Sequence, residues 1–343
     1  MNYKMMGRFI AQILIIAGVF MLPALAISVY CGETAAVYAF LLTLGAFALV
    51  IGLLMLTCRG AASAFYAKEG LVCAGASWIV LSLLSCLPFY FSREIPSYLD
   101  ALFEIVSGFT TTGASVVPKV EKLSNGILYW RSFSHWLGGM GVLVFLLAFT
   151  QSGGKGQGFT MHLLRAESPG PNVGKLVPKM RKTAAILYVL YICLTILNVI
   201  FLLFGKMPLF EAVCTAFGTA GTGGFGIKND SIAGYSPYLQ NVTTVFMALF
   251  GINFSCYYLL LIGNFRSVFK DEELRMYLGI LVGATLLIAW NLRGFYPTLG
   301  ETFRHAAFQV SSIMTTTGFA TTDFGRWPAF SQSILLLLMV IGA

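Results

Sequence analysis

Charged residues are scarce in this chain. Only 10% of its residues are Asp, Glu, Lys or Arg, whereas a soluble globular domain carries about 25%. Hydrophobic residues make up 57% of the chain and gather in long runs. A bilayer-spanning helix needs about 20 apolar residues, while the strand of an outer-membrane barrel needs about ten that alternate. The composition excludes a soluble domain and predicts an all-α polytopic membrane protein.

Patterns for metal binding, redox chemistry and catalysis are also missing. The seven cysteines lie far apart with no Cys-x-x-Cys pair, and the three histidines show no metal-ligand spacing. The glycine cluster at 153–158 lacks the spacing of a phosphate-binding loop. No nucleophile lies beside a candidate base. We therefore expect no enzyme, no covalent cofactor and no resident metal.

Short segments rich in Thr and Gly recur between the apolar runs. The three loops are Gly108–Ser115, Ala220–Phe225 and Met314–Phe319. Each follows a half-helix that is too short to cross a bilayer and that begins near a proline or a glycine. The expected half-helices are 98–109, a segment from Pro208, and 300–313. Irregular backbone at membrane depth must lie in protein or line a watery cavity, so we interpret these loops as re-entrant pore loops.

The repeated unit is an outer helix, a pore helix, a filter loop and an inner helix. Spans are predicted at 9–30, 36–57, 70–91, 127–149, 183–204, 239–263 and 276–293, with a last run from 331. The expected regions are two N-terminal helices (1–68), a first repeat (69–150), a basic linker (151–182), a second repeat (183–264) and a third repeat (265–343). The last run covers about 20 Å of a roughly 30 Å core, so the inner helix of the third repeat is incomplete. We therefore expect a fragment or a truncated protein.

The loops offer oxygen atoms without fixed charge. Neutral oxygens suit a monovalent cation, and the negative end of each pore-helix dipole favours a cation at the loop. The predicted ion-binding residues are Thr111, Thr112, Gly113, Gly221, Thr222, Gly223, Thr316, Thr317 and Gly318. Aligning the three Thr-Gly pairs brings Glu104 into register with Cys214 and Gln309. Small polar residues also join transmembrane helices, but three loops in matched positions favour a filter.

Two polar residues in apolar helices are further candidates for pore-adjacent roles. Arg131 is predicted near the outer end of an inner helix, where it either serves the pore or extends to the membrane interface. Asn253 lies in the middle of a predicted span, where it either marks a kink facing the pore or makes an interhelical hydrogen bond.

The distribution of charge predicts the topology. With the N-terminus in the cytoplasm and each filter loop outside, the whole net charge of +8 falls on the cytoplasmic side. Such an excess of Lys and Arg orients the helices of inner-membrane proteins. Membrane lipid is then the expected surrounding, and the basic composition needs no nucleic-acid partner.

Several motifs together resemble one family. They are Ser107–Ser115, His135–Gly141, Ala166–Pro171, Thr222–Phe225 and Thr315–Phe324. In this order they are similar to the membrane subunit of the Trk/Ktr potassium-uptake family, closest to its TrkH branch in the bacterial cytoplasmic membrane. The resemblance implies four pore-loop repeats around a pseudo-fourfold pore, K+ as the transported ion, a homodimer and a cytosolic nucleotide-binding regulatory subunit of the TrkA type. It also implies a Gly-rich gating loop in the third inner helix.

The resemblance leaves three functions open. The first is gated potassium uptake through a Gly/Thr filter. The second is Na+-coupled K+ symport by the same fold. The third is a non-transporting membrane subunit, because the fourth repeat expected for the family is absent from this sequence.

Overall fold

The computed structural model describes residues 3–59, 67–139, 141 and 180–342, and every regular element in these residues is a helix. The chain divides into two compact units. Unit 1 consists of Met1–Phe109, Ser115–Pro118 and Lys122–Tyr188, and unit 2 of Thr110–Ala114, Lys119–Glu121 and Val189–Ala343. The predicted repeat boundaries do not coincide with this division and stay a prediction.

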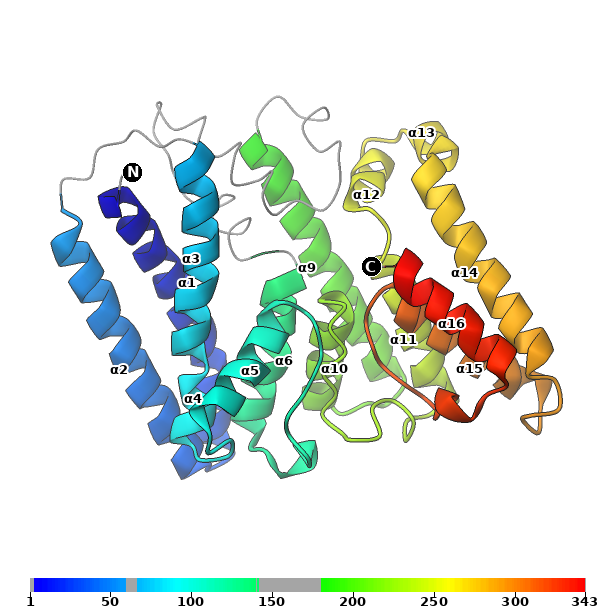
Figure 1. Ribbon diagram of the computed structural model, residues 1–343, viewed down its shortest axis with the longest axis horizontal. Coiled ribbons are helices and arrows are strands. Elements are labelled where there is room, and N and C mark those ends of the chain that lie inside the picture. Colours follow the sequence, from blue (N-terminus) through cyan, green and yellow to red (C-terminus); the bar gives the residue numbers. More distant parts are fainter. Residues whose placement is uncertain (1–2, 60–66, 140, 142–179, 343) are drawn as a thin grey trace. The chain divides into compact units, whose positions relative to one another are not determined.

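Unit 1 begins with long apolar helices. They are α1 (Tyr3–Tyr30), α2 (Thr34–Thr57), α3 (Ala67–Ser85) and α4 (Leu87–Phe91). Helix α1 contacts both α2 and α3 (Figure 1). Helices α1 and α2 and the stretch Val72–Phe91 are long and apolar enough to cross a membrane, which confirms the first three predicted spans.

The helix predicted as the first pore helix lies where the sequence places it. Helix α5 (Tyr98–Phe109) packs on α6 (Asn125–Gly139), and the short η1 (Val120–Lys122) lies between them in sequence. Helix α6 also packs on α1 so closely that a Cβ atom at Gly126 would overlap the Ser28 hydroxyl. The second half of the predicted span 127–149 and most of the linker 151–182 lie outside the described residues.

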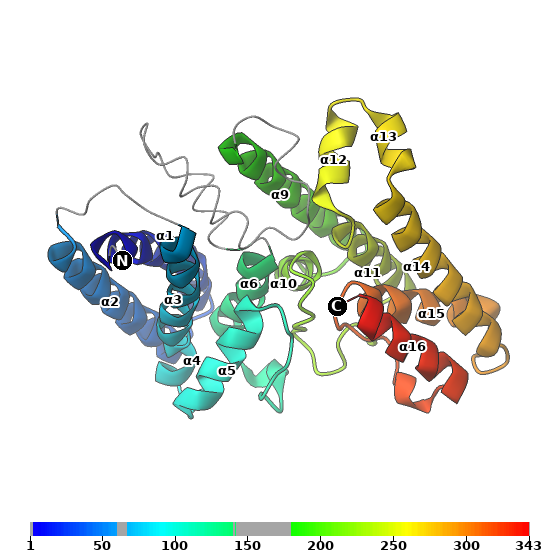
Figure 2. The same ribbon diagram turned by 45° about the horizontal axis from the view of Figure 1, so that its top comes forward.

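Unit 2 contains the helices predicted to be the second and third pore helices. Its helices are α9 (Met180–Phe204, from Val189 onwards), α10 (Leu209–Ala220), α11 (Pro237–Phe250), α12 (Phe254–Leu261), α13 (Phe265–Lys270), α14 (Glu272–Asn291), α15 (Leu299–Met314), η3 (Phe324–Arg326) and α16 (Ala329–Ile341). Helix α15 contacts α11, α14 and α16 (Figure 2). The predicted pore helix of the third repeat is thus held by three neighbours.

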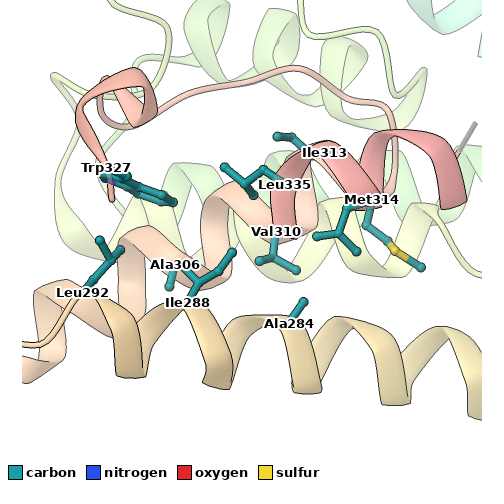
Figure 3. Packing of buried hydrophobic residues seen from close by; sticks show 10 residues of the cluster. Ala284, Ile288, Leu292, Ala306, Val310, Ile313, Met314, Trp327 and Leu335 are labelled. Atoms are coloured by element: carbon teal, nitrogen blue, oxygen red, sulfur yellow. The ribbon is translucent and has the colours of Figure 1, made fainter. Parts of the chain in front are cut away.

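The core of unit 2 joins α14, α15 and α16. Ile288 of α14 and Leu292 directly after it face Ala306 and Val310 of α15, and Leu335 of α16 packs against the same cluster (Figure 3). These side chains are buried in the protein, whereas Leu286 and Leu287 of α14 are exposed. Such outward apolar side chains are expected where lipid, not water, surrounds a helix.

The predicted span 239–263 consists of two helices with a sharp bend between them, close to the kink that was one alternative for Asn253. Helix α11 ends at Phe250, and α12 begins after Asn253 with its axis turned by 87°. A Cβ atom at Gly251 would overlap the side chain of Thr315 and the hydroxyl of Tyr277, so a larger residue at the break would have to displace these side chains. Hydropathy alone misses this bend because the residues on both sides of it are apolar.

Candidate filter loops and their supports

The three loops share one backbone pattern. Each pore helix ends two residues before a threonine with positive φ, and a glycine with positive φ follows two residues later. The threonines are Thr111 (φ 55°), Thr222 (φ 49°) and Thr316 (φ 57°). The glycines are Gly113 (φ 74°), Gly224 (φ 74°) and Gly318 (φ 83°).

The threonines are in a strained conformation. A β-branched residue with positive φ is an outlier, and such strain persists only where the surroundings enforce it. Along each loop φ is positive, then negative, then positive. This alternation turns successive peptide planes over, so that carbonyl oxygens of neighbouring residues can line one side of the loop.

The predicted register of the second loop is wrong by one residue. The backbone matches Thr222 with Thr111 and Thr316, and Gly224, rather than Gly223, with Gly113 and Gly318. The ends of the preceding helices support this match, because α10 ends at Ala220, two residues before Thr222, as α5 and α15 end two residues before Thr111 and Thr316. Residue 215, a threonine, therefore matches Glu104 and Gln309 in place of Cys214. Two glycines follow Thr222, so the sequence alone does not show which of them matches Gly113 and Gly318.

Within unit 2, the three loops contact one another in sequence order. A Cβ atom at Gly113 would overlap the carbonyl oxygen of Gly223, and one at Gly224 would overlap the carbonyl oxygen of Thr317. At Gly318 a Cβ atom would meet no atom of the described residues within 4 Å. The glycines at the first two loops are thus required by close backbone approach as well as by their φ angles.

Paired hydroxyls brace two of the three loops. The Oγ1 atoms of Thr110 and Thr112 are 2.8 Å apart, and those of Thr315 and Thr317 are 2.7 Å apart. In the second loop Gly221 and Gly223 take the matching positions and carry no side chain. That loop therefore presents bare backbone where the others present linked hydroxyls.

A buried carboxylate anchors the chain just beyond the first loop. Glu104 of α5 accepts hydrogen bonds from the Ser115 hydroxyl at 2.9 Å and from the Val116 backbone N–H at 3.0 Å. Arg131 of α6 is its ion-pair partner, with Nε 2.6 Å from Oε1. The Glu104 side chain is 0% exposed and the Arg131 side chain 3%.

This arrangement bears on the two interpretations of Arg131. The guanidinium is buried inside unit 1 in an ion pair, which disfavours a side chain extended to the surface. A pore-adjacent role for Arg131 stays a prediction. Glu104 was not among the predicted site residues. An acid in an apolar half-helix, together with a cation in an apolar helix, is the sequence signal that would have paired them.

Asn253 lies at the bend between α11 and α12. Its side-chain oxygen accepts a hydrogen bond from the Ser255 N–H at 3.0 Å, which caps α12. Its Nδ2 donates to Glu273 of α14 at 3.3 Å, so the residue makes an interhelical hydrogen bond at a kink. Its position beside a pore stays a prediction.

The comparisons with known proteins identify the family. A family model described as "TrkH: Cation transport protein" matches residues 37–343. The chain belongs to the TrkH family. The Trk system potassium uptake protein TrkH of Salmonella typhimurium is 35% identical over all of this chain and 71% of its own length. The corresponding protein of Escherichia coli K12 is 36% identical over 80% of this chain and 58% of its own length.

A solved structure agrees with this assignment. The crystal structure of the potassium transporter TrkH from Vibrio parahaemolyticus matches 98% of this chain and 70% of its own chain, with a TM-score of 0.84 at 28% identity. The TrkH assignment confirms the predicted all-α membrane fold and the potassium-transport class of its relatives. The chain spans between 58% and 71% of the length of these relatives.

Proposed function

We propose that the protein takes up potassium ions across the bacterial cytoplasmic membrane through a filter built from its Thr-Gly loops. The observation that carries this proposal is the repeated backbone of Thr111–Gly113, Thr222–Gly224 and Thr316–Gly318, whose loops contact one another within unit 2. Uncharged oxygens at these loops suit a monovalent ion that must bind and leave. The proposed ligands are the predicted residues of the three loops, with Gly224 added.

The regulatory and assembly features of the family extend this proposal. We infer a cytosolic TrkA-like nucleotide-binding subunit as the regulator, a homodimer as the assembly and a cytoplasmic N-terminus. The relatives are named as components of a Trk system, and the net charge of +8 falls on one side under this topology.

Transport is tested in bacteria that lack their own potassium-uptake systems. The protein restores growth at low K+, and purified protein in liposomes takes up rubidium. The Gly113→Ser variant loses preference for K+ over Na+, because the added side chain would overlap a backbone oxygen of the second loop. Gly279→Ser is the matched control, since a Cβ atom there meets no atom within 4 Å. Unchanged selectivity of Gly113→Ser would remove the first loop from the filter.

The same assays separate the two alternatives. A Na+-coupled symporter requires Na+ for rubidium uptake and accumulates Na+ in step with it. A non-transporting subunit gives no flux in liposomes, although its fold and stability remain intact.

A further inference from the structure

A cavity of about 630 Å³ lies within unit 2 between α11, α14 and α15. Its wall is mainly apolar, formed among others by Val245, Ala248, Leu281, Leu286, Phe303 and Ala307. Cavities of this size and character accommodate small organic molecules or part of a larger amphiphile. None of the filter residues lines this cavity.

One cationic side chain lines the cavity. Arg304 of α15 is 17% exposed, and its Nε atom is buried with no hydrogen-bond partner in the described part of the chain. Its ion-pair partner among the described residues is Glu301, and the distance from the guanidinium to that carboxylate is 4.0 Å. A largely buried cation is stable only when an anion or several acceptors compensate it. The cavity therefore favours an occupant with a negative group at Arg304.

Two buried hydroxyls line the same cavity without partners among the described residues. They belong to Thr285 of α14 and Ser311 of α15, which are 3% and 1% exposed. Helical hydroxyls commonly donate to the carbonyl four residues earlier, as Thr244 beside them does. An unsatisfied buried hydroxyl is costly, so the occupant is expected to bring hydrogen-bond acceptors.

The rim of the cavity is open and apolar. The side chains of Val245, Val282, Leu286 and Phe303 all line it, and each is more than half exposed. Arg304 lies in the second turn of α15, close to the end at which the chain enters that helix, whereas Ser311 lies about two turns deeper. The polar group is thus near one end of the cavity, and apolar wall extends away from it.

We propose that this cavity binds an anionic phospholipid. Its phosphate pairs with the Arg304 guanidinium, its ester oxygens accept hydrogen bonds from the cavity hydroxyls, and an acyl chain lies along the apolar wall. Basic pockets between transmembrane helices recognise acidic lipid headgroups by this chemistry. Because α15 leads directly into the loop at Thr316–Gly318, the bound lipid braces the third filter loop from behind.

The experiment measures lipid binding to the purified protein in detergent by native mass spectrometry. Phosphatidylglycerol and phosphatidylcholine with identical acyl chains are titrated in parallel. Wild type binds phosphatidylglycerol more tightly, and Arg304→Gln weakens that binding by about tenfold, the effect of one lost charge-assisted hydrogen bond. Arg293→Gln is the matched control, since Arg293 is exposed at the end of α14 and does not line the cavity.

A second variant tests occupancy without changing charge. Ala307→Phe fills the cavity and abolishes tight binding while Arg304 remains. Equal affinity for the two lipids, equal losses in both arginine variants, or full binding by Ala307→Phe would each overturn the proposal. Dissociation of a dimer by Arg304→Gln with lipid binding unchanged would assign the face to a second copy of the chain instead. These experiments measure lipid binding and not ion flux. A failure of the lipid proposal is therefore distinguishable from a failure of the proposed transport function.

Discussion

At the scale of single residues, glycines with the same φ sign have different surroundings. Gly113 and Gly318 both lie in the left-handed region, at φ 74° and 83°. A side chain at Gly113 would overlap a backbone carbonyl of the second loop, whereas one at Gly318 would meet no described atom. A backbone carbonyl cannot rotate away as a side chain can, so the two positions differ in tolerance.

Alanine at these two glycines is therefore expected to act unequally. Gly318→Ala suffers only the strain of positive φ, about 1–2 kcal/mol. Gly113→Ala suffers the same strain and also separates the first loop from the second, so its loss of unfolding free energy is larger. Thermal unfolding in detergent micelles measures both. Equal losses would contradict the contact between the two loops.

The ion pair of Glu104 and Arg131 is expected to behave as a unit. Arg131→Gln leaves a buried carboxylate without its cation and lowers the free energy of unfolding by about 3–5 kcal/mol. Glu104→Gln with Arg131→Gln recovers part of that loss, because no buried charge then remains. A double-mutant cycle by thermal unfolding measures the coupling. Additive effects of the two substitutions would show that the contact carries little energy.

At the scale of elements, two carboxylates hold the start of α6. Glu33, from the turn between α1 and α2, accepts hydrogen bonds from the N–H groups of Asn125 at 2.7 Å and Gly126 at 3.1 Å. Glu94 accepts from the Ser124 N–H at 2.8 Å and hydroxyl at 2.7 Å. The turn between α1 and α2 and the segment before α5 thus position α6 through backbone N–H groups that α6 itself cannot satisfy.

Glu94 gives this junction a pH dependence. Burial raises the pKa of its carboxyl group, the Ser124 hydrogen bonds oppose the shift, and the Glu33 charge adds to it. A raised folded-state pKa means that protonation favours the folded state. The contribution is fully present below the unfolded-state pKa, about 4.3, and is lost as pH rises through the folded-state value.

The expected result is a smaller advantage of wild type over Glu94→Gln at neutral pH than in mild acid. Thermal unfolding at a series of pH values between these limits measures the difference. A gap between the two proteins that widens as pH rises would show that the carboxylate is favoured, not disfavoured, in the folded state.

At the scale of the whole molecule, the first loop belongs to the unit that holds the other two. Residues Thr110–Ala114 are part of unit 2, while the pore helix before them is part of unit 1. An ion that binds to loops in the folded protein, and not to the unfolded chain, stabilises the native state by mass action.

Potassium is therefore expected to raise the melting temperature of the purified protein relative to N-methylglucamine at equal ionic strength. At an ion concentration of 100 times the Kd the stabilisation is about 2.7 kcal/mol. Gly113→Ala reduces this increment, whereas Gly279→Ala retains it because a Cβ atom there meets open space. The same increment in all three proteins would place the stabilising ion away from the first loop.

Much of this protein follows from the sequence by itself. The scarcity of charge and the long apolar runs determine a helical membrane protein. Backbone N–H and C=O groups inside a bilayer must be hydrogen-bonded within the protein, and an apolar run of about 20 residues achieves this as a helix. The first pore helix ends at Phe109 as predicted, and the two N-terminal spans are confirmed. These features are local, and local pattern is sufficient to predict them.

Only the tertiary structure decided the remaining features. The bend at Gly251, the partnership of Glu104 with Arg131 and the match of Gly224 with Gly113 each depend on a neighbour distant in sequence. A hydropathy profile does not reveal a bend between two apolar helices. Where two glycines follow a threonine, the sequence does not show which glycine adopts the positive φ. Contact between backbones selects one of these alternatives, and that contact exists only once the chain has folded.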